Sequence, residues 1–107
     1  MTSREERVGR NEALFREVNE RIRDVNEGLN DPSDYLCECG HAECEEHVML
    51  TLAEYEEVRR HATHFAILPG HAVPDVERVV ANGERFAVVE KTDPQAARVA
   101  VREDPRS

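Results

Sequence analysis

Residues 37–47 read CECGHAECEEH and contain all three cysteines of the chain. Cys37 and Cys39 are two positions apart, so on an extended strand their side chains lie on the same side. Gly40 then allows a tight turn, and Cys44 follows after a short loop. Three thiolates and one imidazole are a common ligand set for structural zinc. The cluster therefore predicts a zinc site whose fourth ligand lies elsewhere.

Three histidines compete for the fourth position. His41 lies inside the loop, where its tether is short, and His47 follows Cys44 by a spacing that a helical turn would suit. His71 belongs to the turn sequence Pro-Gly-His, directly after a predicted strand. A zinc ion stabilises a fold most when it closes a long loop, which favours His71. His41 and His47 remain the alternatives.

Length and composition fit a single small domain that needs a metal ion to stabilise its fold. The chain has 107 residues, of which 39% are hydrophobic and 5% aromatic, so the core is thin for this size. No apolar run is long enough for a membrane helix, and no secretory signal is evident, so we expect a cytoplasmic protein. An odd number of cysteines in a reducing compartment favours metal binding over disulfides.

The charge is concentrated in the middle of the chain. The net charge is −9, and residues 31–60 carry nine acidic residues against Arg59 and Arg60. An acidic surface repels phosphates, which argues against nucleic acid or a membrane as direct partners. Basic proteins and cations suit it better.

The N-terminal segment predicts one long amphipathic helix over residues 3–28. Ser3 and Glu6 form a predicted capping box, and Gly28 marks the stop. An apolar stripe with a seven-residue period runs along it: Val8, Phe15, Ile22 and Leu29, with Asn11, Val18 and Val25 between them. The stripe could form a coiled coil, but Leu14 beside Phe15 widens it beyond a narrow seam. We therefore expect a helix that lies partly on its own domain and offers the rest to a partner.

The remaining chain alternates short strands and helices. Strands are expected at residues 34–37, 47–50, 65–68, 76–80 and 86–90, the last two joined by a turn at Asn82-Gly83. Helices are expected after Thr51, with Glu54 completing a capping box, and after Asp93-Pro94. The predicted fold class is α+β: a long N-terminal amphipathic helix, then a small zinc-stapled antiparallel β-sheet with one or two short helices. The predicted domains are an interaction helix at 1–30, a zinc-binding domain at 31–101 and a flexible tail at 102–107.

Several of these segments resemble a group of small uncharacterised proteins from actinobacteria. The likeness rests on Cys37-Glu38-Cys39-Gly40 with Cys44, on Leu50-Thr51-Leu52, on the Pro69-Gly70-His71 turn and on the helix over residues 10–21. In that group the histidine of the Pro-Gly-His turn recurs, whereas the positions of His41 and His47 do not. The resemblance thus implies Cys37, Cys39, Cys44 and His71 as the metal ligands, and it implies no activity.

A site with four protein ligands has no open position, and thiolates make zinc a poor Lewis acid. We therefore predict a structural Zn²⁺ in a protein-interaction or regulatory adaptor module, not an enzyme. The partner would be another protein or a second copy, bound through the N-terminal helix.

Two rival functions, and the identity of the metal, remain open. One rival is a redox- or metal-responsive switch, in which oxidation of the sulfurs releases zinc. The other is an enzyme that uses Cys44 with His47 as base, or a zinc-bound water with Glu43 or Glu46 as proton shuttle. Iron is an alternative to zinc.

Overall fold

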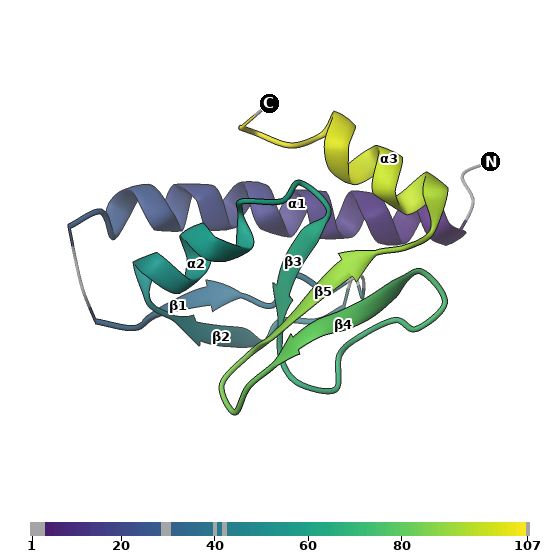
Figure 1. Cartoon of the computed structure of the whole chain (residues 1–107). Coiled ribbons are helices and arrows are strands. Elements are labelled where there is room, and N and C mark those ends of the chain that lie inside the picture. Colours follow the sequence, from purple (N-terminus) through teal and green to yellow (C-terminus); the bar gives the residue numbers. More distant parts are fainter. Residues whose placement is uncertain (1–3, 29–30, 40, 42, 107) are drawn as a thin grey trace.

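The computed structural model describes residues 4–28, 31–39, 41 and 43–106 (Figure 1). A long helix is followed by two small antiparallel sheets and two short helices, which confirms the predicted α+β class. The elements are α1 (Arg4–Val25), β1 (Ser33–Leu36), β2 (His47–Leu50), α2 (Leu52–Val58), β3 (His64–Ile67), β4 (Glu77–Asn82), β5 (Ala87–Lys91) and α3 (Pro94–Arg102). None of the described helices has the length and apolar character needed to cross a membrane.

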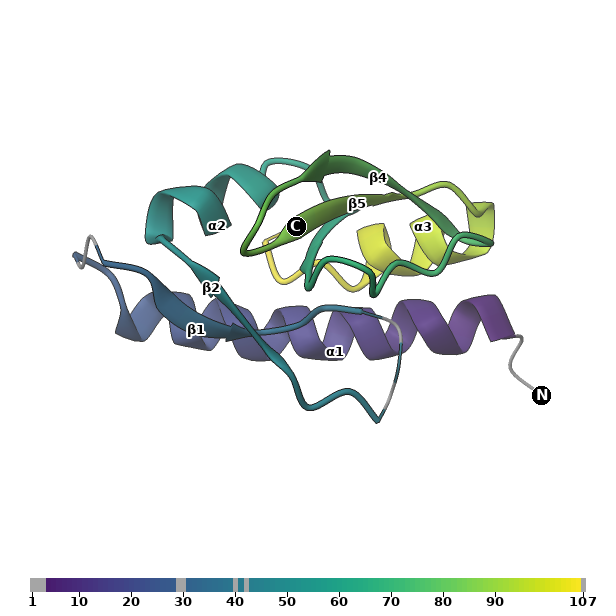
Figure 2. The same cartoon turned by 90° about the horizontal axis from the view of Figure 1, so that it is seen from below.

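Helix α1 spans the length of the molecule in both views (Figures 1 and 2). Helix α3 lies beside its N-terminal half, and the β1–β2 hairpin lies beside its C-terminal half. The expected capping box of α1 involves Ser3, which lies outside the described residues. The other two predicted caps are present: Thr51 and Glu54 form a capping box at α2, and Asp93 caps α3.

The strands form two separate sheets. Strands β1 and β2 pair with each other, and the second sheet has the order β3-β5-β4, so β4 is an edge strand. The predicted β4–β5 hairpin is confirmed, but its turn is longer than an Asn-Gly turn. Asn82 still pairs with Ala87, and Gly83 donates its N–H to the Phe86 carbonyl, so residues 83–86 make the connection.

The apolar core is small and lies between the two sheets and α2. Tyr35 of β1 and Tyr55 of α2 stack with their ring centroids 4.7 Å apart. Val48 and Leu50 of β2 are buried while His47 and Met49 are exposed, which is the alternation of a strand with one covered face. Phe65 and Ile67 of β3 belong to the same core, which agrees with the limited hydrophobic content.

The face that α1 turns toward the domain differs from the apolar stripe expected from its sequence. Phe15, Val18 and Ile22 are only half-buried, and Val25 is 82% exposed. The fully buried side chains of α1 include Glu12, Arg16 and Asn19. Leu29, the last residue of the expected stripe, lies outside the described residues. The helix therefore packs through these polar groups as well as through Val8 and Ala13, and it leaves part of its apolar stripe uncovered.

The buried polar groups of α1 find partners that are distant in sequence. Lys91 of β5 forms ion pairs with Glu12 and Glu77, and the three side chains, here called the buried triad, are fully inaccessible. Arg16 donates to the carbonyl oxygens of Ala62 and Ala100 at 2.5 and 2.6 Å. Buried charges are tolerated when they are paired and hydrogen-bonded in this way.

The segment predicted to be a flexible tail also has ion-pair partners. Asp104 pairs with the fully buried guanidinium of Arg59, and Arg106 pairs with Glu20 and Glu56. These contacts connect the end of the chain to α1 and α2. The mobility of residues 102–107 stays a prediction.

Candidate metal centre

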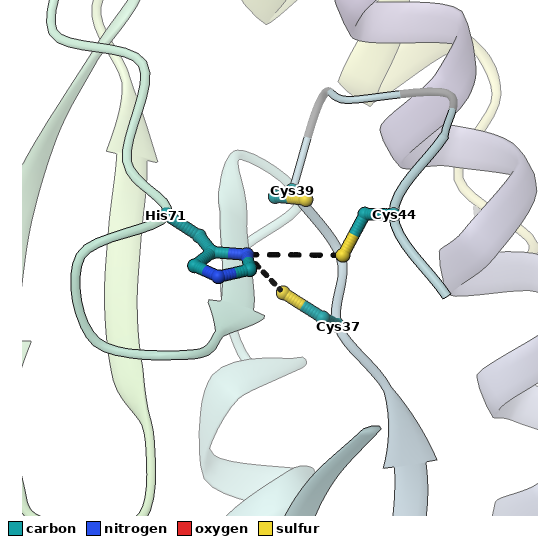
Figure 3. Close-up of side chains that lie close together, drawn as sticks. All are labelled: Cys37, Cys39, Cys44 and His71. Atoms are coloured by element: carbon teal, nitrogen blue, oxygen red, sulfur yellow. Dashed lines mark hydrogen bonds between the residues drawn. The ribbon is translucent and has the colours of Figure 1, made fainter. Parts of the chain in front are cut away.

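Two distant parts of the chain supply the four predicted ligands (Figure 3). Cys37 follows β1 directly, Cys39 is two residues further on, and Cys44 lies in the loop that leads back to β2. His71 comes from the connection between β3 and β4. One ligand atom from each of these residues lies within 4.8 Å of the other three.

Two sulfur-to-nitrogen distances in the cluster fit tetrahedral coordination of a zinc ion. The Nδ1 atom of His71 is 3.6 Å from Cys37 Sγ and 3.7 Å from Cys44 Sγ. Zinc bonds of about 2.3 Å to sulfur and 2.0–2.1 Å to nitrogen, set at tetrahedral angles, place sulfur and nitrogen about 3.6 Å apart. The separations of His71 from Cys37 and from Cys44 thus match those around a bound zinc ion.

The position of His71 is fixed by a tight turn. The His71 N–H donates to the Leu68 carbonyl at 3.1 Å, with Pro69 and Gly70 between them. Gly70 has φ +90°, a left-handed conformation that side-chain-bearing residues rarely adopt. Proline at the second position and glycine at the third are the features of a type II turn. The turn therefore carries His71 back toward the cysteines, as the sequence predicted.

Backbone N–H groups surround the sulfur atoms. The Leu68 N–H donates to Cys37 Sγ at 3.2 Å, and this thiol also receives the N–H of Cys39. Cys39 and Cys44 receive the N–H groups of His41 and Glu46, respectively. Hydrogen bonds to a sulfur favour its ionised form, which is the form that binds metals. These backbone groups favour the thiolate forms, although the hydrogen bond with Cys37 and burial raise the pKa of Cys39, and burial raises the pKa of Cys44.

Without a metal ion, the ionised form of one cysteine is favoured at the expense of another. A hydrogen bond from the Cys39 thiol lowers the pKa of Cys37, and the same bond raises the pKa of Cys39. Burial raises the pKa of Cys44. A divalent cation at the centre removes this competition, because a coordinating thiol is deprotonated outright. Metal binding at this site would therefore release protons.

Glu38, which the sequence reading did not single out, anchors the ligand loop. Its side chain is fully buried. The carboxylate accepts hydrogen bonds from the Asn19 side chain at 2.8 Å and from the Ala66 N–H at 2.9 Å. The Glu38 N–H donates to the Ala66 carbonyl at 2.8 Å. This residue thereby connects the cysteine segment to both α1 and β3.

The two other candidate histidines do not join the cluster. His47 is exposed on β2, and His41 is exposed within the loop. Among the described residues, His71 is the histidine that lies with the three cysteines.

Comparisons of the chain with protein-family models, curated proteins and solved structures find no match. The resemblance to the actinobacterial group accordingly stays a prediction, and the function has to be argued from the site itself.

Proposed function

We propose that this chain is a small structural-zinc protein that acts as a protein-interaction module. The observation that carries the proposal is the convergence of Cys37, Cys39, Cys44 and His71 within 4.8 Å of one another. Three sulfurs and one imidazole nitrogen are a ligand set that suits zinc. Zinc also agrees with the expectation of a reducing cytoplasm, where thiols stay free for metal.

The zinc would cross-link two segments that already share the hydrogen bonds of Glu38 to Ala66 and of Leu68 to Cys37. Cys37 and His71 are 34 residues apart in sequence. Closing a loop of that length costs chain entropy in the folded state, and a metal bond offsets this cost. When bound, the ion would supply structural cross-linking, since four protein donors leave no open coordination position for a substrate.

The uncovered part of α1 supports the interaction role. Leu14 and Val25 are 57% and 82% exposed, although they lie on a well-formed helix with a buried opposite face. Apolar groups on such a surface are commonly covered by a partner. The partner is another protein or a second copy of this chain, and the acidic centre of the sequence would steer a basic protein toward it.

The metal half of the proposal is tested by analysis of the purified protein. We expect one zinc per chain by elemental analysis, and a lower melting temperature after treatment with a chelator. Iron in the purified protein, or a melting curve that a chelator does not change, would contradict it.

The interaction half needs variants that leave α1 in place, because its buried face belongs to the fold. Leu14→Arg combined with Val25→Arg should abolish self-association in sedimentation, or the capture of proteins from the native host. Val101→Arg on α3 is the matched control, since Val101 is 52% exposed. If the double variant behaves like this control, α1 is not the contact surface.

A redox-responsive zinc switch is a second candidate, and the exposure of Cys44 favours it. Cys44 is half-buried, whereas Cys37 and Cys39 are buried. Hydrogen peroxide would oxidise the Cys44 thiolate to a sulfenic acid and be reduced to water. A neighbouring thiolate would then displace hydroxide from that sulfur to form a disulfide, releasing zinc. Zinc release by peroxide that a thiol reductant reverses, and that Cys44→Ser slows, would support this candidate over a permanent staple.

A further inference from the structure

A groove opens on the side of the three-stranded sheet that α1 does not cover. Its volume is about 400 Å³, and it lies between α2 and the β4–β5 hairpin. This volume falls within the range of binding pockets. The apolar part of its lining comes from Val58, Val80, Ala81, Phe86 and Val88. It is separate from the metal centre, since none of its lining residues is a predicted ligand.

Strand β4 borders this groove and has an open edge. It pairs with β5 on one side only, because it is the last strand of the described sheet. Val79 and Val80, which are consecutive in β4, are 48% and 41% exposed. The register shifts between Val79 and Ala81, so Val80 has no partner in β5. An open edge with exposed apolar residues is a surface on which another strand can pair.

Two carboxylates, each paired with an arginine, belong to the lining of the groove. Among the described residues that line it, Glu54 and Glu57 are acidic, and none is lysine or arginine. Arg85 holds Glu54 at 2.6 Å. Glu57 pairs with Arg60 at 3.1 Å, but both side chains are about 70% exposed. Exposed pairs contribute little free energy, so Glu57 can exchange Arg60 for a cation of a ligand.

The opposite end of the groove carries two histidines. His61 and His64 have ring centroids 4.4 Å apart, and His64 Nε2 lies 3.2 Å from a carboxylate oxygen of Glu90. His64 belongs to β3. The imidazoles provide flat surfaces and polar edges beside the apolar floor. An apolar side chain flanked by polar or cationic ones suits such a lining.

We propose that this groove and the β4 edge together bind an extended, basic peptide segment of a partner protein. The segment would add as a strand along β4, with one apolar side chain in the groove. A lysine or arginine two residues away in the segment lies on the same face and would pair with Glu57. The net charge of −9 disfavours a second copy of the chain as the occupant and favours a basic partner.

The probe for this proposal is a capped peptide of sequence Thr-Lys-Thr-Val-Thr-Lys-Thr, added to the zinc-loaded full chain. Its valine and lysines share one face of an extended strand, while the threonines favour that conformation. We expect its addition to shift the backbone amide resonances of residues 78–82 and 86–88. The matching peptide with glutamate in place of lysine should leave them unchanged.

Two variants with equal exposure separate specific binding from general charge attraction. Val80→Arg should weaken binding of the lysine peptide by about tenfold or more, because it blocks the groove and repels the peptide. Met49→Arg is the control, since Met49 on β2 is also 41% exposed but does not line the groove. Glu57→Gln should weaken binding by a smaller factor. Away from the substituted residue, the amide spectrum of each variant without peptide should match that of the original chain.

Three results would overturn the proposal. One is the absence of shifts along β4 at millimolar peptide. Another is an equal loss of affinity in Val80→Arg and Met49→Arg, which would indicate nonspecific attraction to an acidic protein. The third is concentration-dependent shifts at β4 without peptide, which would make a second copy the occupant. Because the test uses β4 resonances, its outcome is independent of whether α1 binds a partner.

Discussion

The side-chain amide of Asn19 on α1 pairs with both backbone groups of Leu36 on β1. Asn19 Nδ2 donates to the Leu36 carbonyl at 2.9 Å, and the Leu36 N–H donates to Asn19 Oδ1 at 2.7 Å. The amide therefore occupies the place that a neighbouring strand would take at this edge. It fixes β1 against α1 one residue before the first cysteine of the metal centre.

Removal of this amide should destabilise the fold. Asn19→Ala leaves the partly buried Leu36 N–H and carbonyl without their Asn19 partner, and Glu38 also loses a donor. We expect the free energy of unfolding in urea to fall by about 2–4 kcal/mol. Asn82→Ala, at the exposed end of β4, is the control and should change it by less than about 0.5 kcal/mol. Similar losses in the two variants would mean that the pairing contributes little.

Zinc binding should distinguish His71 from the other histidines. We expect His71→Ala to lower zinc affinity by about 100-fold or more, since it removes a proposed ligand. His47→Ala and His41→Ala should leave it within about threefold of the original chain. Competition with a chromophoric chelator measures all three. Loss of affinity in His47→Ala alone would move the fourth ligand to β2.

The buried triad should respond differently to loss of its cation and loss of one anion. Lys91→Met leaves Glu12 and Glu77 buried without a counter-charge, and we expect a loss of about 3–5 kcal/mol in unfolding free energy. Glu12→Gln should cost less than about 1 kcal/mol, because burial already raises the pKa of Glu12 and opposes its charge. Chemical denaturation of both variants at one pH provides the comparison. Equal losses would contradict this account.

The raised pKa of Glu12 also predicts a pH dependence with a definite sign. A carboxyl group whose folded pKa exceeds its unfolded value binds its proton more tightly in the folded state. Its contribution to stability is therefore complete below about pH 4.5 and is lost as the pH rises through the folded pKa. Relative to Glu12→Gln, the original chain should lose stability as the pH rises above about 4.5. If the unfolding free energies of the two proteins change in parallel with pH, this predicted pH dependence is wrong.

The end of the chain provides a further test. The Arg59 guanidinium is fully buried and pairs with Asp104 and Glu20. Asp104→Asn should lower the free energy of unfolding by about 1–3 kcal/mol, because it leaves part of a buried charge uncompensated. Glu103→Gln, beside it but largely exposed, is the control. If both variants are as stable as the original, residues 102–107 are the flexible tail that the sequence predicts.

Local chemistry was enough to predict the metal cluster and most elements. The cysteine spacing and the Pro-Gly-His turn specify geometry over a few residues, and Thr51 and Asp93 mark helix starts through hydrogen bonds to their own neighbours. These features depend on contacts within one turn or loop. The structure reproduces them within one or two residues.

The buried face of α1 could not be predicted in the same way. Periodicity assigns Val18 and Val25 to the packed side, yet Asn19 and Arg16 are buried there instead. Burial of such groups depends on partners such as Leu36 and Ala100, which the fold brings to the helix from far along the chain. A local pattern of apolar residues contains no information about those partners. The burial of Glu38 likewise depends on distant partners, Asn19 and Ala66.

The buried triad has a consequence for labelling and modification of the protein. Lys91 is the only lysine in the sequence, and its side chain is fully inaccessible in the folded state. Acylating reagents and enzymes that attach ubiquitin or acetyl groups to lysine would find no ε-amine on the intact molecule. Reaction at Lys91 would then report opening of the α1–β5 contact, so the rate of acylation at this one amine would measure the rate or extent of local unfolding.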